Sequence, residues 1–520
     1  MTGLDDEFDF VVVGSGGGSM CSALVMRDAS RSVVILEKTG LIGGTTARSG
    51  GILWIPNSRF MKEHGIPDSR EAATAYLEAT SGQSVNAPGT TAGKPLAYID
   101  HAPKMIDFLV SKGVRLRRPL SWPDYHDELP GGSVPGRTVG AELFDTRALG
   151  AWQSKLRPAF LPLPATPDEL QCLWAFKPSW KARAAMLRVA LRVMRARLTG
   201  ANVVSFGAAL QGRMLLACLE NGVDLRVDSG VTGFLVEDGA VKGVITRRNG
   251  RDWRIGVRLG VLVNAGGFSQ NREMRARYQP DLRVDWTGAT EGDTGEMLQA
   301  MMKLGAATGQ MDAIVGQQMM IGPVCENRGN GVNLMQVGGQ KDIAKPHSIL
   351  VDRTGARYLN EGGSYVLFCQ LMRQRNCQVP ATPSWQVVDS RYMEKYMYCG
   401  TMPGTAKPRE WLDSGFLLKK TDTIEALAGQ MEVDPAVLRA TVDTFNEGVC
   451  QGRDPLFHRG NRAYDNWLGD FTRQGSQALG PIEKGPFYAT PVVPGDLGTL
   501  GGVVTDVHAR VLREDGSPVP

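Results

Sequence analysis

The 520-residue sequence has little of what usually builds metal centres or covalent cross-links. Its eight cysteines form no CxxC pair, and its six histidines form no HExxH motif or Cys/His cluster. Structural zinc and iron–sulfur sites normally need such clusters, so we expect no metal site. A chain of this length buries a large core without disulfide staples, and we expect the cysteines to be free, buried thiols.

Long apolar runs and a one-sided charge are also missing. No stretch of about 18 apolar residues occurs, and the acidic start MTGLDDEFDF has no signal-peptide pattern. Lys and Arg number 58 against 54 Asp and Glu, and the two signs are interspersed. We therefore expect no nucleic-acid partner and a cytoplasmic globular protein. The length predicts two or more domains.

What the sequence does contain begins with a nucleotide-binding pattern. The apolar, β-branched run FDFVVV leads directly into GSGGGSMCSALVMRDA, which returns to helical spacing, so a strand, a glycine turn and a helix are predicted. A second β-rich run, SVVILEK, carries Glu37, which follows Gly14 by 23 positions. At this spacing a carboxylate meets a ribose hydroxyl in dinucleotide-binding units.

The residue types fit that chemistry. Gly14 permits the tight turn, Gly16 lets the backbone approach a pyrophosphate, and the helix amino-terminus offers N–H groups to the phosphates. The third glycine of GxGxxG falls at Ser19, which is small enough to weaken the motif without removing it.

A second glycine-rich stretch, LIGGTTARSGGILWIPNS, follows the acid at once and predicts which nucleotide binds. Its small side chains and backbone donors suit an extended ligand such as FAD, whereas NAD sites do not usually carry it. An apolar strand closing on residues 265–267 completes the expected domain. The predicted cofactor-binding residues are Gly14, Ser15, Gly16, Gly18, Ser19, Glu37, Lys38, Gly43, Gly44, Thr45, Thr46, Ser49, Gly50, Gly51, Ala265, Gly266 and Gly267.

Matching stretches from end to end resemble the flavoproteins of the fumarate reductase and succinate dehydrogenase superfamily, and within it the 3-ketosteroid Δ1-dehydrogenase family. They include GVLVNAGGFSQNREMRARYQ, RYLNEGGSY, DPLFHRGNRAYD and GPFYATPVVPGDLGTLGG. The resemblance implies an α/β fold, with a Rossmann-like FAD-binding domain containing a β-meander and an inserted α+β catalytic cap. We expect the FAD-binding domain at 1–285, the cap at 286–484 and a return to the first domain at 485–520, apparently cut short.

The resemblance also implies the chemistry. In this family the flavin accepts a hydride from C1 of a 3-ketosteroid, and a tyrosine removes the C2 proton during bacterial-type steroid breakdown. Tyr365, in NEGGSY, matches the base, and Tyr125, in WPDY, matches a tyrosine that assists it. A phenol is a poor base at neutral pH unless a partner stabilises the phenolate, so a hydrogen-bonded pair makes chemical sense. Either tyrosine could instead be an ordinary core residue.

The family grips the steroid C3 oxygen with a tyrosine and a glycine N–H that lie after the segment matching REDGSP, whereas this sequence stops at Pro520. The sequence is then either a fragment of a longer product or a complete but degenerate protein. If 520 is the true end, we expect weak flavin retention and little dehydrogenase activity.

Several alternatives stay open. They are Δ4-(5α) dehydrogenation of ketosteroids, a fumarate-reductase-like activity that would use cations such as His347, Arg353 and Arg357, and a truncated, non-catalytic flavoprotein. The expected partners are a steroid and an external electron acceptor, quinone-like or a dye. The basic amphipathic stretch 180–198 fits peripheral contact with an anionic membrane, or packing on the protein's own core.

Overall fold

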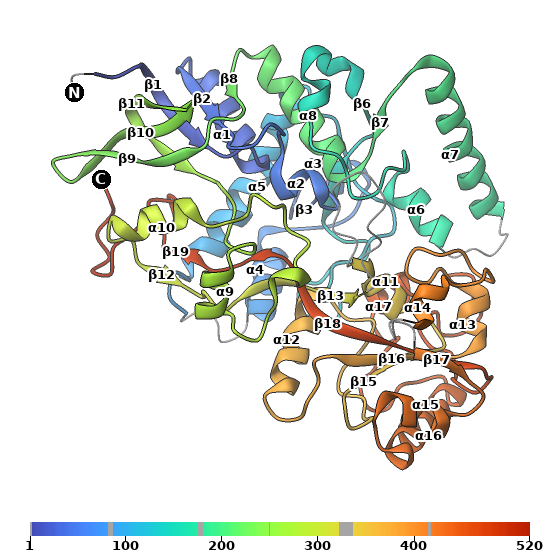
Figure 1. Cartoon of the computed structure of the whole chain (residues 1–520). Helices are drawn as coiled ribbons and strands as arrows, with labels where there is room; N and C mark the ends of the chain where they lie inside the picture. Colours follow the sequence, from blue (N-terminus) through green and yellow to red (C-terminus); the bar gives the residue numbers. More distant parts are fainter. Residues whose placement is uncertain (1–2, 82–86, 175–179, 249, 322–335, 414–417) are drawn as a thin grey trace.

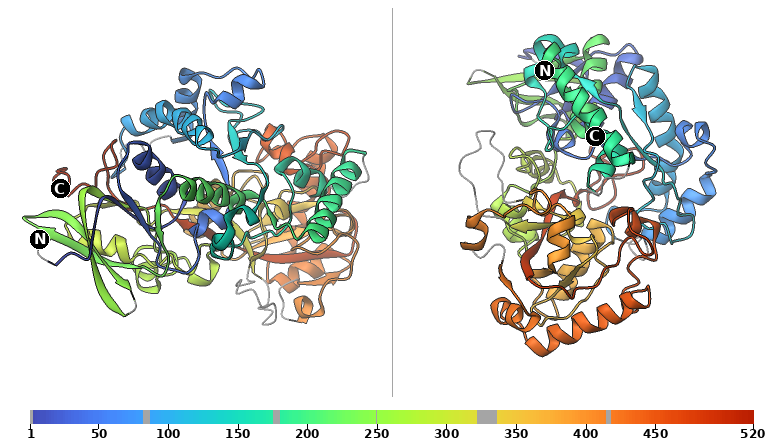
Figure 2. Two further views of the ribbon diagram at one scale, coloured as in Figure 1. Left: turned by 90° about the horizontal axis from the view of Figure 1, so that it is seen from above. Right: turned by 90° about the vertical axis from the view of Figure 1, so that its right-hand side faces the viewer.

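The computed structural model describes residues 3–81, 87–174, 180–248, 250–321, 336–413 and 418–520. The chain forms two parts, each built around a six-stranded sheet. Figure 1 shows the first part, with both chain ends, at the upper left and the second part, in yellow to red, at the lower right. The right-hand view of Figure 2 shows the same two parts one above the other.

The first sheet is Rossmann-like, as predicted. Strands β8, β2, β1 and β11 run parallel, with β8 at one edge, and β10 and β9 continue the sheet as an antiparallel meander. The strand bounds, in sheet order, are β8 Asp224–Arg226, β2 Val33–Leu36, β1 Asp6–Val13, β11 Arg251–Val263, β10 Ala240–Arg248 and β9 Val231–Glu237.

Both faces of this sheet are covered, which is why β2 is apolar at every position and β1 is apolar over its last four residues. Val12 and Ile35 pack against helices α1 (Gly17–Asp28), α5 (Gly93–Ser111) and α8 (Phe206–Glu220) on one face. Val11 and Val13 point to the other face, toward the meander and Met297 of α10 (Glu296–Lys303). The alternation follows the two-residue period of a strand.

The second sheet is antiparallel throughout. Its order is β14, β13, β18, β16 and β15, with β17 also paired to β18. Helices α12 (Tyr365–Asn376) and α13 (Ser390–Lys395) cover one face, and α15 (Ile424–Met431) and α16 (Pro435–Cys450) cover the other. The strands are β14 Gln336–Gly338, β13 Ile314–Ile321, β18 Phe487–Thr499, β16 Ser384–Val388, β15 Ser348–Val351 and β17 Leu418–Thr421.

The remaining elements are short or lie around the first sheet. They are α2 Gly44–Arg48, β3 Ile52–Trp54, α3 Arg59–Glu63, α4 Arg70–Ser81, β4 Leu116–Arg117, β5 Thr138–Ala141, β6 Phe144–Asp145, α6 Pro167–Trp174, α7 Trp180–Thr199, β7 Val203–Val204, α9 Arg272–Tyr278, β12 Thr308–Gly309, α11 Gln340–Ile343, α14 Arg409–Asp413, α17 Ala463–Leu468 and β19 Gly502–Val503, with 3-10 segments at Thr146–Lys155 and Val284–Trp286.

Strand β18 follows the predicted boundary at 484 but lies in the second sheet, beside β13 and β16. After β18 the chain returns to the first part, where Phe268 N donates to Thr499 Oγ1 at 3.3 Å and Val241 N donates to Pro520 O at 2.8 Å. The division at 285 and 484 stays a prediction.

Two sequence expectations concern the surface. The seven described cysteines are free, as expected, but Cys377 and Cys450 are exposed because both lie at helix C-terminal ends that face solvent. Among the described residues, no helix combines the length and apolar character needed to cross a bilayer.

A buried charge network fixes the segment between β15 and α12. Glu361 accepts hydrogen bonds from Arg357 Nε at 2.8 Å, from Arg459 Nη1 at 3.3 Å and from Leu350 N at 3.0 Å. Arg357 Nη2 also donates to Asp454 at 2.8 Å, and all four charged side chains are at most 1% exposed. Two guanidinium groups and two carboxylates thus neutralise one another without water.

Replacing Glu361 tests how much this network contributes to stability. In Glu361→Gln two buried guanidinium groups lose a counter-charge, so we expect the free energy of unfolding to fall by about 3–5 kcal/mol. The measurement is the urea unfolding midpoint. Glu425→Gln is the matched control, since Glu425 pairs with Arg439 at the surface and should leave the midpoint unchanged. Equal midpoints for both variants would contradict the expectation.

Candidate active site

Two glycine turns lie side by side at the carboxyl edge of the first sheet. Helices α1 and α2 begin after Gly16 and Gly43, and neither helix start has a side-chain cap. The two turns are in contact, because Gly17 N at the start of α1 lies 3.5 Å from Thr46 Oγ1 at the start of α2. Both helix amino-termini therefore present backbone N–H groups that can donate hydrogen bonds to a phosphate.

The backbone of the first turn requires glycine. Gly14 has a φ of +94°, and a Cβ there would lie 2.4 Å from Asn264 O. This close approach puts the turn against residues 264–265, which follow β11. Sequence reasoning placed residues 14 and 265 in one site, and the fold brings them into contact.

The space beside the turns fits a ligand. A Cβ on Gly16 would meet only Thr46 Oγ1, at 3.7 Å, and a Cβ on Gly44 would meet no atom within 4 Å. Open space beside two uncapped helix starts is what an extended diphosphate ligand such as FAD needs. The residues present therefore fit that cofactor.

Glu37 links the two turns. Its buried carboxylate accepts from Ser15 Oγ at 2.6 Å and from Thr39 N at 2.9 Å, and Ser15 Oγ accepts from Gly43 N at 2.9 Å. Thr39 Oγ1 donates to the same carboxylate at 2.9 Å. These three bonds leave lone-pair capacity for one more donor, such as a ribose hydroxyl. Lys38, by contrast, reaches away to Glu296, at 3.0 Å.

The other predicted residues surround these turns. Thr45 Oγ1 lies 3.4 Å from Thr290 Oγ1, and Ser49 Oγ accepts from Gly51 N at 3.0 Å, which stiffens the turn through Gly50. Gly267 N donates to Asp293. Gly266, next to it, has no room for a side chain beside that carboxylate. Gly18 starts α1 against the Asn264 amide, with Ala265 and the buried Ser19 nearby.

Sequence reasoning missed Gln211. This side chain on α8 is fully buried, and neither atom of its amide has a hydrogen-bond partner among the described residues. A Cβ on Gly17 would lie 3.3 Å from its Nε2, and a Cβ on Gly43 would lie 3.3 Å from its Cγ. Buried polar groups normally have a hydrogen-bond partner, so this unpartnered amide between the two turns is expected to bind a ligand or water. In the sequence, the feature that could have identified Gln211 is that it is a polar residue in the otherwise apolar stretch FGAALQG.

The two predicted catalytic tyrosines meet. Tyr125 Oη donates to Tyr365 Oη over 3.4 Å, and the rings stand edge to face with centroids 5.5 Å apart. The oxygen separation is longer than the usual 2.7–2.8 Å, as hydrogen bonds of unliganded active sites often are. Tyr464 packs on Tyr125 with ring centroids 4.8 Å apart.

Burial keeps Tyr125 protonated. Desolvation, reinforced by the nearby Tyr464 and Tyr365 hydroxyls, raises the pKa of Tyr125 well above its usual range. Tyr125 therefore stays protonated at neutral pH. It can keep donating its hydrogen bond to the Tyr365 oxygen.

Buried carboxylates position both tyrosines. Asp124 accepts from Trp54 Nε1 and from Arg137 N, both at 3.0 Å, which fixes the residue before Tyr125 against β3. Arg137 also donates to Asp68 at 2.7 Å. Tyr365 begins α12 immediately after the cap Ser364 and follows the segment that Glu361 holds.

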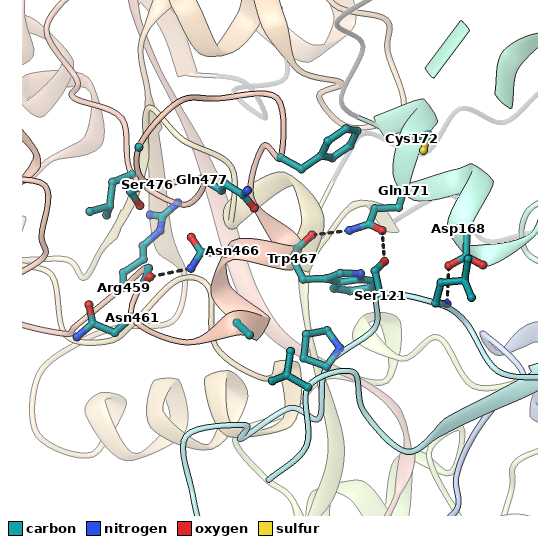
Figure 3. Close-up of a pocket in the computed structure, with 18 of the residues that line it drawn as sticks. Ser121, Asp168, Gln171, Cys172, Arg459, Asn461, Asn466, Trp467, Ser476 and Gln477 are labelled. Carbon is teal, nitrogen blue, oxygen red and sulfur yellow. Dashed lines mark hydrogen bonds between the residues drawn. The ribbon is translucent and has the colours of Figure 1, made fainter. Parts of the chain in front are cut away.

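A cavity of about 910 Å³ lies near the tyrosines, although neither Tyr125 nor Tyr365 lines it. Its lining comes mainly from α6 and from residues of the segments 120–134 and 452–479. Figure 3 shows Gln171 of α6 at its centre, bonded to Ser121 at 2.8 Å and to Trp467 O at 3.4 Å. Trp467 stacks on Tyr464 with centroids 5.8 Å apart, so an aromatic series leads from the cavity wall to the tyrosine pair.

The cations considered for dicarboxylate binding are engaged elsewhere. Arg357 belongs to the Glu361 network, and Arg353 lies 3.6 Å from Glu432. His347 has Nδ1 2.7 Å from Pro481 O, and burial lowers its pKa, which favours the neutral ring. Within the ranges described, no group of three or more His, Cys, Asp or Glu side chains could hold a metal ion.

Comparison with known proteins agrees with this geometry. The profile of a family described as FAD binding domain matches residues 9–520. The chain is 36% identical to a 3-oxosteroid 1-dehydrogenase of Mycobacterium tuberculosis, over 98% of this chain and 91% of that protein. It is 32% identical to a 4-oxocyclohex-2-ene-1-carboxylate 5-dehydrogenase of Sinomonas cyclohexanicum, over 98% and 87%.

Among solved structures, 3-ketosteroid Δ1-dehydrogenase from Sterolibacterium denitrificans, in complex with 1,4-androstadiene-3,17-dione, superposes with a TM-score of 0.89 at 31% identity. The match covers 99% of this chain and 92% of that one. The predicted fold and cofactor are confirmed: the chain belongs to the FAD-dependent flavoenzyme family of the 3-oxosteroid 1-dehydrogenases.

Proposed function

We propose that this enzyme removes two hydrogens from ring A of a 3-ketosteroid and forms a C1–C2 double bond. The observation that carries the proposal is the hydrogen-bonded pair of Tyr125 and Tyr365 in a chain 36% identical to a 3-oxosteroid 1-dehydrogenase. The neighbouring cavity of about 910 Å³ is within the size range of sites for drug-sized molecules.

FAD would lie along the two glycine turns, with its pyrophosphate at the starts of α1 and α2 and a ribose hydroxyl on Glu37. When bound, the flavin accepts the hydride from C1. The groups we assign to holding it are Gly14, Ser15, Gly16, Gly18, Ser19, Glu37, Gly43, Gly44, Thr45, Thr46, Ser49, Gly50, Gly51, Ala265, Gly266, Gly267 and the additional Gln211. Lys38 is left out because its side chain pairs with Glu296.

Tyr365 acts as the base in this proposal. Its oxygen takes the C2 proton, and the electrons of the C2–H bond form the new C1–C2 double bond as the C1 hydride leaves. Tyr125 remains protonated and donates to the Tyr365 oxygen, which stabilises the negative charge there.

Each turnover reduces the flavin, so an external acceptor must reoxidise it. We propose a quinone-like molecule, for which a dye substitutes in an assay. A cytoplasmic location stays a prediction.

A second candidate substrate comes from the Sinomonas relative, whose name specifies a ring ketone that carries a carboxylate. Both substrates need a proton removed beside a ring carbonyl, so the same tyrosines would serve. We favour the steroid because the identity to the steroid enzyme is higher, 36% against 32%.

The first test is the visible spectrum of the purified protein during anaerobic addition of a saturated 5α-3-ketosteroid. We expect the flavin band to bleach and the product to carry a 1,2 double bond. A 4,5 double bond would identify the Δ4-(5α) activity instead. Bleaching only with 4-oxocyclohex-2-ene-1-carboxylate would overturn the substrate class, and a flavin that ignores both would support the non-catalytic alternative.

Removal of the base tests its role directly. We expect Tyr365→Phe to lower kcat by about 10²–10⁴-fold, the usual contribution of a positioned base, while flavin content stays unchanged. Tyr488→Phe is the matched control, since this tyrosine of β18 packs on the second core away from the pair. Full turnover by Tyr365→Phe with normal flavin content would refute the assignment.

Removal of the assisting tyrosine should change both the rate and its pH dependence. In Tyr125→Phe the donor to the negative oxygen is lost, so we expect kcat/KM at neutral pH to fall about 10- to 100-fold. We also expect the acidic limb of the pH–rate profile to move to higher pH, because the base then binds its proton more tightly. A reduced rate with an unshifted profile would indicate a merely structural role.

A further inference from the structure

Two arginines lie beside the second glycine turn. Arg48 ends helix α2. Arg157 comes from a segment far along the sequence, and the backbone of that segment is fixed against Ile42. Ile42 N donates to Lys155 O at 2.7 Å, and Arg157 N donates to Ile42 O at 3.0 Å. Since Ile42 directly precedes Gly43, this distant segment borders the turn.

The half-buried guanidinium of Arg157 is only partly satisfied within the protein. Its Nη2 donates to Thr39 Oγ1 at 3.2 Å, whereas its buried Nε has no hydrogen-bond partner among the described residues. The charged groups that face it are the carboxylates of Glu37 and Glu291 and the guanidinium of Arg48. In the part of the chain that the structure describes, neither carboxylate forms an ion pair with it. A buried donor without an acceptor indicates a ligand or water at this position.

The cofactor site needs cations of this kind. A diphosphate brings its negative charge close to the buried carboxylate of Glu37, whereas a helix start offers only about half a positive charge. Lys38, the one cation among the residues predicted to bind FAD, pairs with Glu296 instead. Arg48, like Arg157, forms no ion pair within the described ranges. Both guanidinium groups are therefore available to an anionic ligand.

We propose that Arg157, together with Arg48, binds the diphosphate of FAD. A guanidinium group donates two parallel hydrogen bonds to phosphate oxygens, and such charge-assisted bonds are stronger than neutral ones. The unpartnered Nε of Arg157 supplies one of these donors. Burial lowers the pKa of Arg157, and a bound diphosphate offsets this cost by favouring the charged form.

Diphosphate binding by these arginines does not depend on the proposed steroid chemistry. A chain that binds FAD through them but leaves every ketosteroid unchanged would refute the chemistry alone. Normal FAD affinity in the absence of both guanidinium groups would refute the diphosphate contact and leave the chemistry intact. FAD affinity therefore decides one proposal, and turnover decides the other.

The test is the dissociation constant of FAD from the full-length holoenzyme, measured by the fluorescence of the flavin that is released on dilution. We expect Arg157→Met and Arg48→Met each to weaken FAD binding by about 10- to 100-fold, because each loses hydrogen bonds to a charged group. Arg147→Met is the matched control. It removes an arginine of the neighbouring 3-10 segment that pairs with Asp145, and it should bind FAD as wild type.

Salt and a second ligand separate a phosphate contact from a structural role. Ions screen the contact, so FAD should bind the wild type more weakly as salt increases, and this dependence should be smaller in both variants. ADP, which carries the diphosphate without the flavin, should compete with FAD and lose affinity by the same factor. Unchanged FAD affinity, wild-type salt dependence or unaltered ADP affinity would each overturn the proposal. Each variant is a complete test, so a failure of Arg157→Met to fold leaves Arg48→Met to decide.

Discussion

The buried carboxylate of Glu361 is the constraint on which the second part of the molecule depends. Its side chain is 0% exposed to solvent, so its charge is balanced by two guanidinium groups and a backbone N–H from β15. Arg357 comes from the same loop, whereas Arg459 comes from a segment about a hundred residues later. One charge therefore fixes sheet, loop and C-terminal segment together, and Tyr365 follows it by four residues. The base that we propose at Tyr365 would need such support, because it must lie within reach of a single carbon atom.

The first part of the molecule was largely predictable because its signals are local. A β-branched run, a glycine turn, a helix and a spaced acid follow one another within thirty residues, and each specifies the conformation of its own neighbourhood. The antiparallel meander also follows from short alternating runs. The place of β18 was harder to predict, since its pairing with β13 depends on contacts almost two hundred residues apart.

In the site, too, the residues with local sequence signals were predictable and the others were not. Glycines 14, 16 and 44 could be recognised from spacing, and the tyrosines from the resemblance of their surroundings. Gln211 and Asp124 could not be recognised, because what distinguishes them is a partner, or the lack of one, that only the folded chain supplies. Helix α7 illustrates the limit best. Its sequence contains two stripes, one of small and one of large apolar residues, and helical periodicity does not say which of them faces inward.

The bond between Asp124 and Trp54 has a consequence for the two halves of the reaction. Trp54 ends the strand that follows Gly50 and Gly51, and Asp124 directly precedes Tyr125. This bond thus ties the backbone that would border the flavin to the loop that carries Tyr125, the tyrosine that we propose assists the base. Whatever orders one of them orders the other, and thermodynamic linkage makes the effect mutual. If flavin binding orders these two segments, linkage requires that flavin and steroid strengthen each other's binding by the same factor.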